Sequence, residues 1–513
     1  MRNKLIFVLL LSYSMNKKIV QAIIGPLLFF LLAVLPPLPF VTQASQQVKA
    51  PFPNAPQVAL GGLIWVATWW IFEVAPLGLT GLLAAALFSL LGFVSWGDSL
   101  KSFTDPIIWV FMGGFVLAKA FQVSGLDRRI ALWIANLYKG QNPMIAALFV
   151  AGLPVFFLTM TGSITASTSV VYPIVLSFLA LTRASDRYSE ATLLLLGEAA
   201  TAGAMLFLIS TPPNLIAKQV IESNVPGLTI TFFDWFIVGT VQAVIGLLIV
   251  WIIVFAVLGV KKEHSLEKLQ EIVIQERAKL PPMSIREKIV LGVFLFALFL
   301  WLIPGLLNIA ANLDPNLQTL AKTASSMLPE AVPAVLAILL LGLIKVQGRP
   351  LLTFKEISEG IDWNVVFLFG GGLAMGKALD SSGFSSWIGL IVTNSSIQPN
   401  TYTLSIIGGV LGFLITFPAS NTASAIVAAP LIAKIAKAAG VNPVAPVITT
   451  ALACSISSAI PSTTPPMAII YGSGKVNIKN MFRAGFLADI TRLLILVATE
   501  PILVQLFLSL KGL

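Results

Sequence analysis

The chain is a series of long apolar runs separated by short polar segments. A helix that crosses a bilayer needs about 20 apolar residues, and eleven segments meet that criterion. They are 19–39, 58–73, 78–95, 107–122, 192–223 and 234–259, followed by 289–308, 333–347, 363–379, 443–474 and 480–510. The pattern predicts an all-α polytopic membrane protein with about 11 transmembrane helices.

The apolar pattern is duplicated within the chain. FMGGFVLAKAFQVSG (111–125) aligns without gaps with FGGGLAMGKALDSSG (369–383). Three further blocks follow in the same order: GSITASTSVVYPI with ASNTASAIVAAPL, STPPN with TTPPM, and DWFIVGTVQAVIGLLI with NMFRAGFLADITRLLI. Similarity by composition alone is the alternative, and four ordered blocks argue against it. Each copy holds five crossings, an odd number, so the copies insert in opposite orientations, as in the inverted-topology repeats of secondary transporters.

The polar segments give the expected orientation and boundaries. Residues 261–288 carry seven Lys or Arg and are too polar to span, so the positive-inside rule places them in the cytoplasm. Lys17 and Lys18 fall on the same side, because an even number of crossings separates them from this linker. The predicted divisions are an N-terminal segment with the first helix (1–57), a first repeat (58–259), the linker (260–288) and a second repeat (289–513).

Small polar clusters interrupt two pairs of apolar stretches, 143–161 with 166–182 and 401–419 with 423–438. Each pair either crosses twice, which leaves the parity of the repeat odd, or forms a re-entrant hairpin. Non-helical backbone at membrane depth occurs only where protein or a watery cavity surrounds it, and Ser, Asn and Thr side chains cap helix starts at such breaks. We therefore expect one re-entrant hairpin in each repeat.

Two consecutive prolines interrupt one apolar segment of each repeat, in STPP (210–213) and TTPP (463–466). Proline removes a backbone donor and clashes with the preceding turn, so the helix breaks. The half that restarts presents its N-terminus and positive dipole end to an anion, while carbonyl groups freed at the break are available to a cation. A plain proline kink is the alternative, but the motif occurs twice, each time beside a polar hairpin tip.

Composition narrows the function. Hydrophobic residues make up 57% of 513 and charged residues 11%, with a mean hydropathy of +0.92. The net charge of +10 resides in short loops, so no nucleic-acid surface is predicted. The single cysteine, Cys454, lies in an apolar stretch, and the single histidine, His264, lies in the linker. These positions argue against metalloprotease or triad chemistry. The P-loop-like spacing GGLAMGKA (371–378) sits in an apolar helix and is better explained by close helix packing. We expect a protein that is not an enzyme.

Paired tips reading SNT or SIT, each followed by a TPP-broken helix, resemble the divalent anion:sodium symporter family of di- and tricarboxylate transporters. The first tip, SIT with a downstream Tyr-Pro, is similar to the bacterial and plastid 2-oxoglutarate/malate translocator branch. The resemblance implies a homodimer that moves its substrate by an elevator-type mechanism. It also implies a location in the cell inner (plasma) membrane, with the plastid inner envelope as a less favoured alternative.

The resemblance assigns roles position by position. Substrate carboxylates would be bound by Ser163, Thr165, Thr211, Pro212, Ser420, Asn421, Thr422, Thr464 and Pro465. Sodium ions would be bound by Thr159, Ser163 and Ser210 in the first repeat and by Thr416, Asn421 and Thr463 in the second. The first site departs from the family, because Ile164 stands where the family has Asn. No cofactor other than sodium is expected.

These features predict a secondary active transporter of dicarboxylates such as 2-oxoglutarate and malate, working by antiport. The alternatives are a sodium-coupled di- or tricarboxylate or sulfate symporter and, less favoured, an anion channel. Glu198 is an intramembrane carboxylate with no evident partner, and by default such a group is functional. Lys119 and Lys377 either snorkel to the interface or supply charge to the site. Residues 1–14 resemble a signal peptide without a cleavage site, or else precede a true start at Met15.

Overall fold

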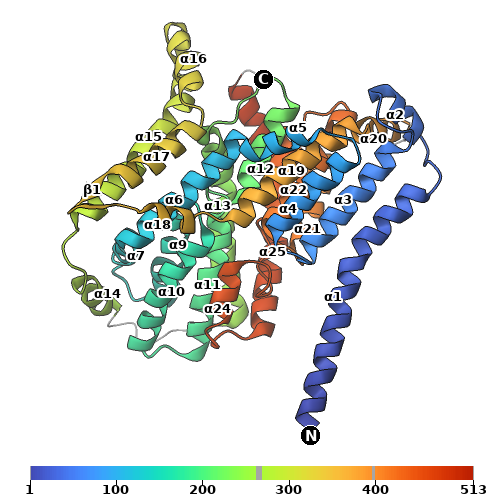
Figure 1. Cartoon of the computed structure of the whole chain (residues 1–513). Coiled ribbons are helices and arrows are strands. Elements are labelled where there is room, and N and C mark those ends of the chain that lie inside the picture. Colours follow the sequence, from blue (N-terminus) through green and yellow to red (C-terminus); the bar gives the residue numbers. More distant parts are fainter. Residues whose placement is uncertain (1, 261–268, 395–398, 512–513) are drawn as a thin grey trace.

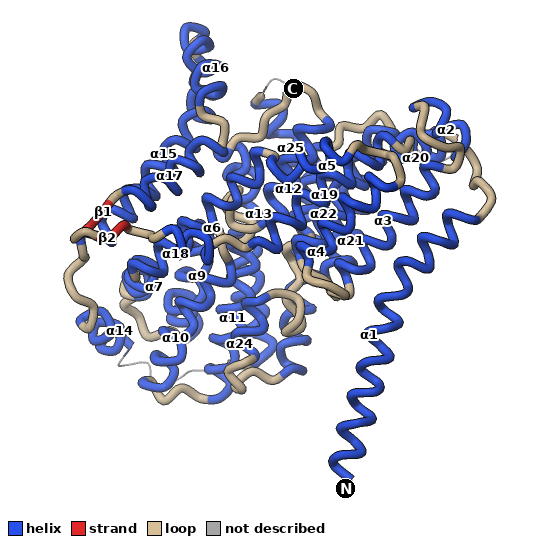
Figure 2. The backbone as a smooth tube through the Cα atoms, in the orientation of Figure 1, coloured by secondary structure: helices blue, strands red, loops and turns tan. Residues whose placement is uncertain are grey.

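The computed structural model describes residues 2–260, 269–394 and 399–511. Its described part is almost entirely helical, with one two-stranded antiparallel hairpin of β1 (Lys345–Val346) and β2 (Arg349–Pro350) (Figure 2). The prediction of an all-α polytopic protein is confirmed. Parts of the linker, including His264, lie outside the described residues.

The N-terminal half begins with α1 (Arg2–Val34) and α2 (Val41–Val48). It continues with α3 (Ala55–Ile71), α4 (Leu77–Leu90), α5 (Trp96–Lys101), α6 (Pro106–Ser124), α7 (Leu126–Ala135), α8 (Pro143–Ala147), α9 (Leu153–Leu158), α10 (Ile164–Leu181), α11 (Asp186–Gly203), α12 (Pro212–Asn224) and α13 (Phe232–Leu258). The π-helical turn η2 (Leu148–Gly152) joins α8 to α9, so that Pro143–Thr161 forms one arm.

The C-terminal half begins after α14 (Leu269–Ala278), which lies in the linker. It contains α15 (Ile285–Leu313), α16 (Gln318–Met327), α17 (Ala331–Leu343), α18 (Phe354–Gly360), α19 (Trp363–Ser381), α20 (Phe384–Thr393), α21 (Thr401–Thr416), α22 (Asn421–Ala438), α23 (Val444–Ala453), α24 (Pro465–Tyr471) and α25 (Ile478–Leu510). Apart from α16, each element has a counterpart at the same place in the first half, from α3 with α15 to α13 with α25. Figure 1 shows the two halves interleaved within one body.

Contacts between the halves are reciprocal. Helix α4 packs against α19, and the counterpart pair α17 and α6 also packs together. The same holds for α12 with α22 and α24 with α10, and for α5 with α19 and α18 with α6. Two copies related by a two-fold axis produce this exchange of partners.

The counterpart helices α13 and α25 run in opposite directions. Near the start of α13, Asp234 bonds Lys511 at the C-terminal end of α25. Further along, Gln242 donates to Thr499, and Gly246 lies beside Arg492. Residue numbers therefore increase along α13 in the direction in which they decrease along α25. Antiparallel counterparts are what an inverted-topology pair requires.

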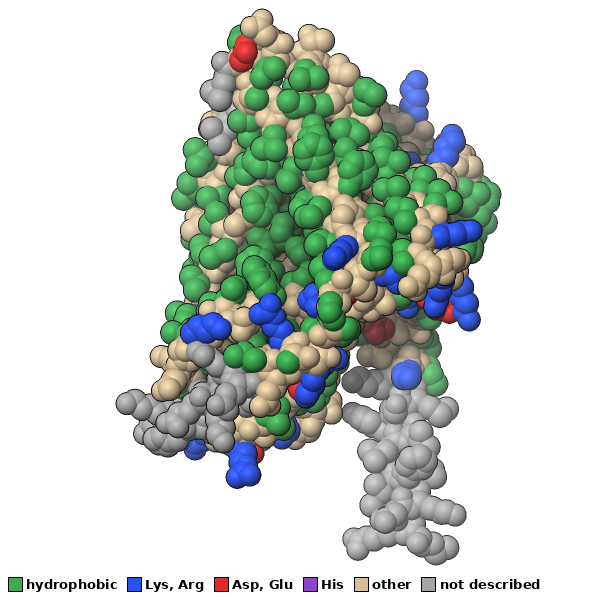
Figure 3. Space-filling view, turned by 90° about the vertical axis from the view of Figure 1, so that its left-hand side faces the viewer, with side chains coloured by type: hydrophobic (Ala, Val, Ile, Leu, Met, Phe, Trp, Pro, Cys, Tyr) green, Lys and Arg blue, Asp and Glu red, His purple; other side chains and the backbone are tan. Residues whose placement is uncertain are grey.

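Six helices in the described part are long and apolar enough to cross a membrane, and the pair α16 and α17, bent by 56°, would add a seventh. The six are Trp96–Ser124, Pro143–Thr161, Ile164–Leu181, Phe232–Leu258, Ile285–Ala311 and Ile478–Ser509. Shorter apolar helices such as α3 and α4, and the half-helices of the broken segments, fall below that length. Helix α19, which covers the predicted span 363–379, has 19 residues but is not among the six. Figure 3 shows a broad apolar surface with Lys and Arg side chains gathered toward its lower edge.

Three predicted spans are too long by several residues. Segment 333–347 was expected to be helical throughout, but α17 ends at Leu343, and Lys345 and Val346 pair with β2. Likewise α1 ends at Val34 within the predicted span 19–39, and α4 ends at Leu90 within 78–95. The polar linker, in contrast, is held against the bundle by ion pairs. Arg129 of α7 lies 2.6 Å from Glu287, and Arg128 lies 3.4 Å from Glu276.

Glycines allow helices to approach closely in the segment with P-loop-like spacing. A Cβ at Gly371 in α19 would lie 2.1 Å from the carbonyl oxygen of Gly81 in α4. The segment is an uninterrupted stretch of helix packed against another helix, so it has neither the loop nor the exposed amides of a phosphate site. The packing interpretation is confirmed for Gly371 and for Gly372, where a Cβ would lie 2.6 Å from Ile426 Cγ2, but a Cβ at Gly376 would meet no atom within 4 Å.

Candidate functional site

Two hairpin tips form the first part of the site. In the first repeat, Ser163 caps α10 by accepting a hydrogen bond from Ala166 N at 3.1 Å. In the second repeat, α22 begins at Asn421 directly after Ser420, whose backbone is extended. The first-turn N–H groups of a helix have no partner within that helix. Both tips therefore present hydroxyl groups and backbone donors from a helix N-terminus, and the second tip adds the side-chain amide of Asn421.

Gly162 makes the turn in the first tip. Its φ is +96°, in the left-handed region that favours glycine. A Cβ there would also lie 2.9 Å from the backbone carbon of Gly114 in α6. The tip therefore rests directly against α6, which fixes the position of the adjacent Ser163.

The broken helices form the second part of the site. Helix α11 ends at Gly203 and α12 restarts at Pro212, while α23 ends at Ala453 and α24 restarts at Pro465. The capping residues have nearly the same backbone angles, φ −154° and ψ 148° at Thr211 and φ −145° and ψ 148° at Thr464. The mid-segment breaks predicted from the double prolines are confirmed in both repeats.

The donors at these restarts differ from the expectation. Prolines occupy the first two helical positions and have no N–H, and the next amides are used locally: Asn214 N donates to Thr211 O at 3.3 Å and Met467 N to Thr464 O at 3.0 Å. The prediction of exposed amides at the start of α12 and α24 is therefore wrong. The threonine hydroxyls take their place, and the buried Thr464 Oγ1 has no hydrogen-bond partner.

One cavity of about 500 Å³ brings tips and breaks together. All nine predicted substrate-binding residues line it: Ser163, Thr165, Thr211, Pro212, Ser420, Asn421, Thr422, Thr464 and Pro465. These residues come from four segments spread over about 300 positions of sequence. Sequence reasoning therefore identified the polar interior of this cavity.

The sequence analysis did not identify the residues at the rim of the cavity. Glu73, in the turn between α3 and α4, and Asp362 and Asn364, at the start of α19, also line it. Glu73 has a positive φ of 46°, which is unusual for a residue other than glycine. The capping of α19 by Asp362 is a signal that could have been recognised from the sequence DWN.

Oxygen atoms converge beside the second tip. Thr416 Oγ1 lies 2.8 Å from Asn421 Oδ1 and 2.8 Å from the carbonyl oxygen of Cys454, at the point where α23 ends. A hydroxyl, an amide oxygen and a freed carbonyl are the ligands that a sodium ion takes in a broken-helix site. Thr463, the third predicted ligand of this repeat, bonds Ile460 O at 2.8 Å within the break.

The first repeat has a similar but poorer cluster. Thr159 Oγ1 lies 2.9 Å from the carbonyl oxygen of Gly203, where α11 ends, and 3.5 Å from Ser210 Oγ. These contacts match those of Thr416 with the Cys454 carbonyl. The amide oxygen of the second cluster has no equivalent, because Ile164 occupies that place at the start of α10. The two predicted cation sites are therefore unequal in their oxygen donors.

No Lys or Arg is among the described residues that line the 500 Å³ cavity. Lys119 packs against Gly360, before the start of α19, and Lys377 lies near the opposite end of that helix. The interpretation in which these lysines supply charge to the cavity is therefore wrong. A bound anion would instead be stabilised by hydroxyls, amides, helix N-termini and any cation bound beside it.

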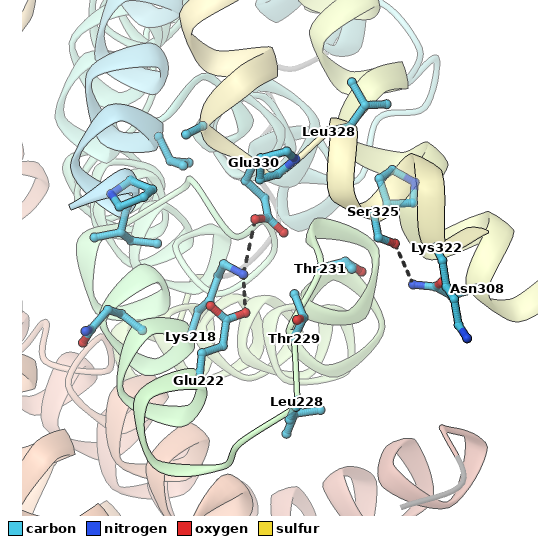
Figure 4. Close-up of a pocket in the computed structure, with 18 of the residues that line it drawn as sticks. Lys218, Glu222, Leu228, Thr229, Thr231, Asn308, Lys322, Ser325, Leu328 and Glu330 are labelled. Carbon is cyan, nitrogen blue, oxygen red and sulfur yellow. Dashed lines mark hydrogen bonds and ion pairs between the residues drawn. The ribbon is translucent and has the colours of Figure 1, made fainter. Parts of the chain in front are cut away.

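A second cavity is larger, at about 980 Å³, and lies elsewhere (Figure 4). Among the described residues, three lysines line it: Lys218, Lys322 and Lys511. The buried Lys218 contacts Glu222 at 2.5 Å and Glu330 at 3.4 Å. Lys511 contacts Asp234 at 2.5 Å, so carboxylates already compensate two of the three charges. None of the predicted site residues lines it. The smaller cavity, with its uncompensated hydroxyl and amide groups, is the better candidate for an anion.

Re-entrant hairpins and broken helices that meet at one internal cavity define a secondary transporter rather than an enzyme. Comparison with known families agrees. The chain belongs to the family described as the sodium:sulfate symporter transmembrane region, whose model matches residues 29–508. The resemblance to the divalent anion:sodium symporters is thereby confirmed.

The chain is also similar to individual proteins, at low sequence identity. The chain is 30% identical to the sodium-dependent dicarboxylate transporter SdcS of Staphylococcus saprophyticus, over 96% of this chain and 92% of that protein. It is also 30% identical to SdcS of Staphylococcus aureus USA300, over 85% and 83%. The solved structure of Neisseria gonorrhoeae MtrF, from a class of antimetabolite efflux pumps, is similar in fold alone, with a TM-score of 0.51 and 14% identity over 79% of this chain and 83% of that one.

Proposed function

We propose that the protein is a secondary active transporter of dicarboxylates in the plasma membrane. The observation that carries this proposal is the 500 Å³ cavity, in which two hairpin tips and two helix restarts present hydroxyl and amide groups. The substrate named for the SdcS relatives supports the same class. An elongated dianion would place one carboxylate near Ser163 and Thr165 and the other near Asn421 and Thr422.

The size of the cavity favours a dicarboxylate over an inorganic oxyanion. Ligand pockets for small molecules span roughly 300–1,000 Å³, and the cavity lies within that range. A tetrahedral sulfate would contact only one tip and leave the hydroxyls of the other without a partner. Unpaired polar groups in a closed site cost free energy, about 1–3 kcal/mol each, so the two-tip arrangement selects an anion with a charge at each end.

The second-repeat cluster is the proposed sodium site. Its three oxygen donors, from Thr416, Asn421 and Cys454, lie beside the tip that would bind a carboxylate. A cation there would balance part of the dianion's charge in a cavity without basic side chains. Sodium dependence in the SdcS relatives supports this assignment.

We further propose that exchange of one dicarboxylate for another, such as malate for 2-oxoglutarate, is the preferred mode. With Ile164 in the first cluster, at most one sodium ion has a full set of donors, and a dianion entering with one sodium carries net negative charge. Moving one charge against the membrane potential costs about 2.3 kcal/mol per 100 mV. Exchange of two dianions cancels that cost.

Transport by the purified protein in proteoliposomes would distinguish exchange from symport. Vesicles loaded with malate should take up labelled 2-oxoglutarate readily, with little dependence on the sodium gradient, whereas empty vesicles should take up little. Strong concentrative uptake into empty vesicles, driven by a sodium gradient, would show that symport is the mode. Uptake of labelled sulfate, but of no dicarboxylate, would overturn the substrate class itself.

We also propose that residues 58–259 and 289–513 act as inverted repeats, that the protein is a homodimer, and that the domain carrying both tips moves as an elevator. The reciprocal contacts and the antiparallel α13 and α25 support the first point. The family resemblance suggests the other two. Light scattering of the detergent-solubilised protein would measure the oligomeric state, and a monomeric mass would contradict the dimer.

A further inference from the structure

A cluster of buried charges lies outside the substrate cavity. It joins Glu198 of α11, Asp489 and Arg492 of α25, and Ser458 of the break in the second repeat. Glu198, Asp489 and Ser458 have no exposed surface, and Arg492 is 3% exposed. The candidate sodium clusters contain none of these residues, and of the repeated blocks only 480–495 contains any of them, Asp489 and Arg492.

The contacts of one hydroxyl determine how many protons the cluster holds. Ser458 Oγ lies 2.6 Å from Glu198 Oε2 and 2.6 Å from Asp489 Oδ1. A hydroxyl has one hydrogen to donate, and an ionised carboxylate accepts only. Ser458 can therefore donate to one carboxylate only, and the other must carry a proton and donate to Ser458. Two such short contacts require one additional proton.

The surroundings indicate which carboxylate holds that proton. Asp489 Oδ2 accepts from Ser458 N at 2.8 Å, and Arg492 lies 4.0 Å from Asp489 Oδ1. These donors stabilise an ionised Asp489. Glu198 Oε1, in contrast, has no hydrogen-bond partner, which is much less costly for the carbonyl oxygen of a neutral acid than for a buried anion.

The balance of charge within the cluster also places the proton on Glu198. Arg492 donates to Thr201 Oγ1 at 2.9 Å and is the only basic group of the cluster in the described structure. With Asp489 ionised and Glu198 protonated, the cluster is neutral. With both acids ionised it would carry a net negative charge that no contact in the described structure balances, and a buried uncompensated charge is costly.

No other charged group in the described structure takes part. Helices α9, α10, α21, α23 and α24, which pack against α11 or α25, contain no charged residue, and the sole one in α13, Asp234, bonds Lys511. On α11, Glu190 accepts hydrogen bonds from Asn477 N and Asn480. On α25, Glu500 lies near Gln242.

The fold itself does not require this cluster. In the aligned block of the first repeat, the counterparts of Asp489 and Arg492 are Ala243 and Gly246 in α13. Arg492 extends over Gly246, where a Cβ would lie 3.2 Å from Nε. The first repeat therefore packs the same positions without charge, so the pair of Asp489 and Arg492 is specific to the second repeat.

We propose that the cluster is a proton-binding site, with one proton held by Glu198 and donated to Ser458. The bound proton ties the break of the second repeat to α11, because without it one of the two contacts of Ser458 would have to open. The same break carries Thr463 and Thr464, which line the substrate cavity. Proton binding at Glu198 and ligand binding at these threonines are thereby linked, and such linkage acts equally in both directions.

Infrared spectroscopy of the purified protein at neutral pH tests this site without any transport assay. A protonated carboxylic acid has a carbonyl band, sensitive to deuterium exchange, that a carboxylate lacks. Glu500 is also buried, so the measurement uses Glu500→Gln as the background. We expect a protonated-acid band in that protein, its loss when Glu198→Gln is added, and its retention with Glu190→Gln, which alters an acid of the same helix whose partners are N–H donors.

The Glu198→Gln change keeps the shape of the side chain, and its amide can donate to Ser458 in place of the acid. The variant should therefore fold, which size-exclusion chromatography and thermal unfolding would check. Absence of any protonated-acid band in the Glu500→Gln protein, which needs no change in the cluster, would overturn the proposal. So would a band that is unaffected by Glu198→Gln. Neither result depends on which anion is transported.

Discussion

At the scale of residues, the proposed anion site has no basic side chain among the described residues that line it. Ser163, Thr165, Asn421 and Thr422 contribute short polar groups from two helix N-termini. Each N-terminus carries the equivalent of roughly half a positive charge, so two of them facing one cavity can replace a lysine. Weakly charged donors also release a substrate more readily than a buried ammonium group would, and a carrier must release what it binds.

Asn421 serves two ligands in this scheme. Asn421 lines the substrate cavity, and its Oδ1 accepts from Thr416 in the candidate sodium cluster. We expect Asn421→Ala to reduce dicarboxylate uptake at least tenfold, since a hydrogen bond to a charged group contributes about 1.5–3 kcal/mol. Uptake by proteoliposomes and thermal unfolding would be measured together. Asn308→Ala, in the larger cavity, is the control, and near-normal uptake by a folded Asn421→Ala protein would contradict the site.

Ile164 offers a gain-of-function experiment. Ile164→Asn would add an amide oxygen near Thr159 and the Gly203 carbonyl, completing the set found in the second repeat. We expect uptake to become more steeply dependent on sodium, with a Hill coefficient rising from about one toward two, the number of sites. Ile164→Val keeps the position apolar and is the control. If the two variants show the same sodium dependence, Ile164 does not disable the first cluster.

The polar interior of the site could be predicted from sequence because each repeat concentrates it in short motifs. Ser163 and Thr165 adjoin each other, as do Ser420, Asn421 and Thr422. The partner of Glu198 could not be predicted, because Ser458 and Asp489 come from a different repeat and from two separate segments. Only packing of α11 against the second break brings them together.

At the scale of elements, the local chemistry of proline and glycine determines where helices stop. The double prolines were sufficient to predict both restarts, at Pro212 and Pro465. The short helices α7 and α20 were not predicted. Each has only 10 residues and follows a glycine of positive φ, Gly125 or Gly383, so neither produces an apolar run long enough to identify it.

Gly162 is the most demanding of these positions. Gly162→Ala would place a methyl group against the backbone of Gly114 and force a left-handed conformation on alanine. We expect a loss of about 1–3 kcal/mol in stability, measured as a lower unfolding temperature, together with reduced uptake because Ser163 would be displaced. Gly227, which has a similar φ but open space around it, provides the control. Equal effects of Gly162→Ala and Gly227→Ala would show that contact with α6 is unimportant.

At the scale of the whole molecule, two inverted copies create one site between them. The antiparallel course of α13 and α25 places the corresponding ends of these counterpart helices on opposite sides of the bundle. Both tips nevertheless line the same cavity. Cysteines at positions 163 and 420 would therefore be labelled from the same side in this conformation, and labelling of the tips does not test inversion.

The helix ends provide the decisive test. Asn136 and Asn394 are counterparts, each following the last residue of a short helix, α7 or α20. After Cys454→Ala removes the single native thiol, Asn136→Cys and Asn394→Cys would be labelled separately in intact cells with a reagent that does not cross the membrane. The linker next to α7 is rich in basic residues and is expected in the cytoplasm, so Asn394→Cys should react from outside and Asn136→Cys only after the cells are opened. Reaction of both from the same side would show that the two repeats share one orientation, and the reciprocal contacts would then need another origin.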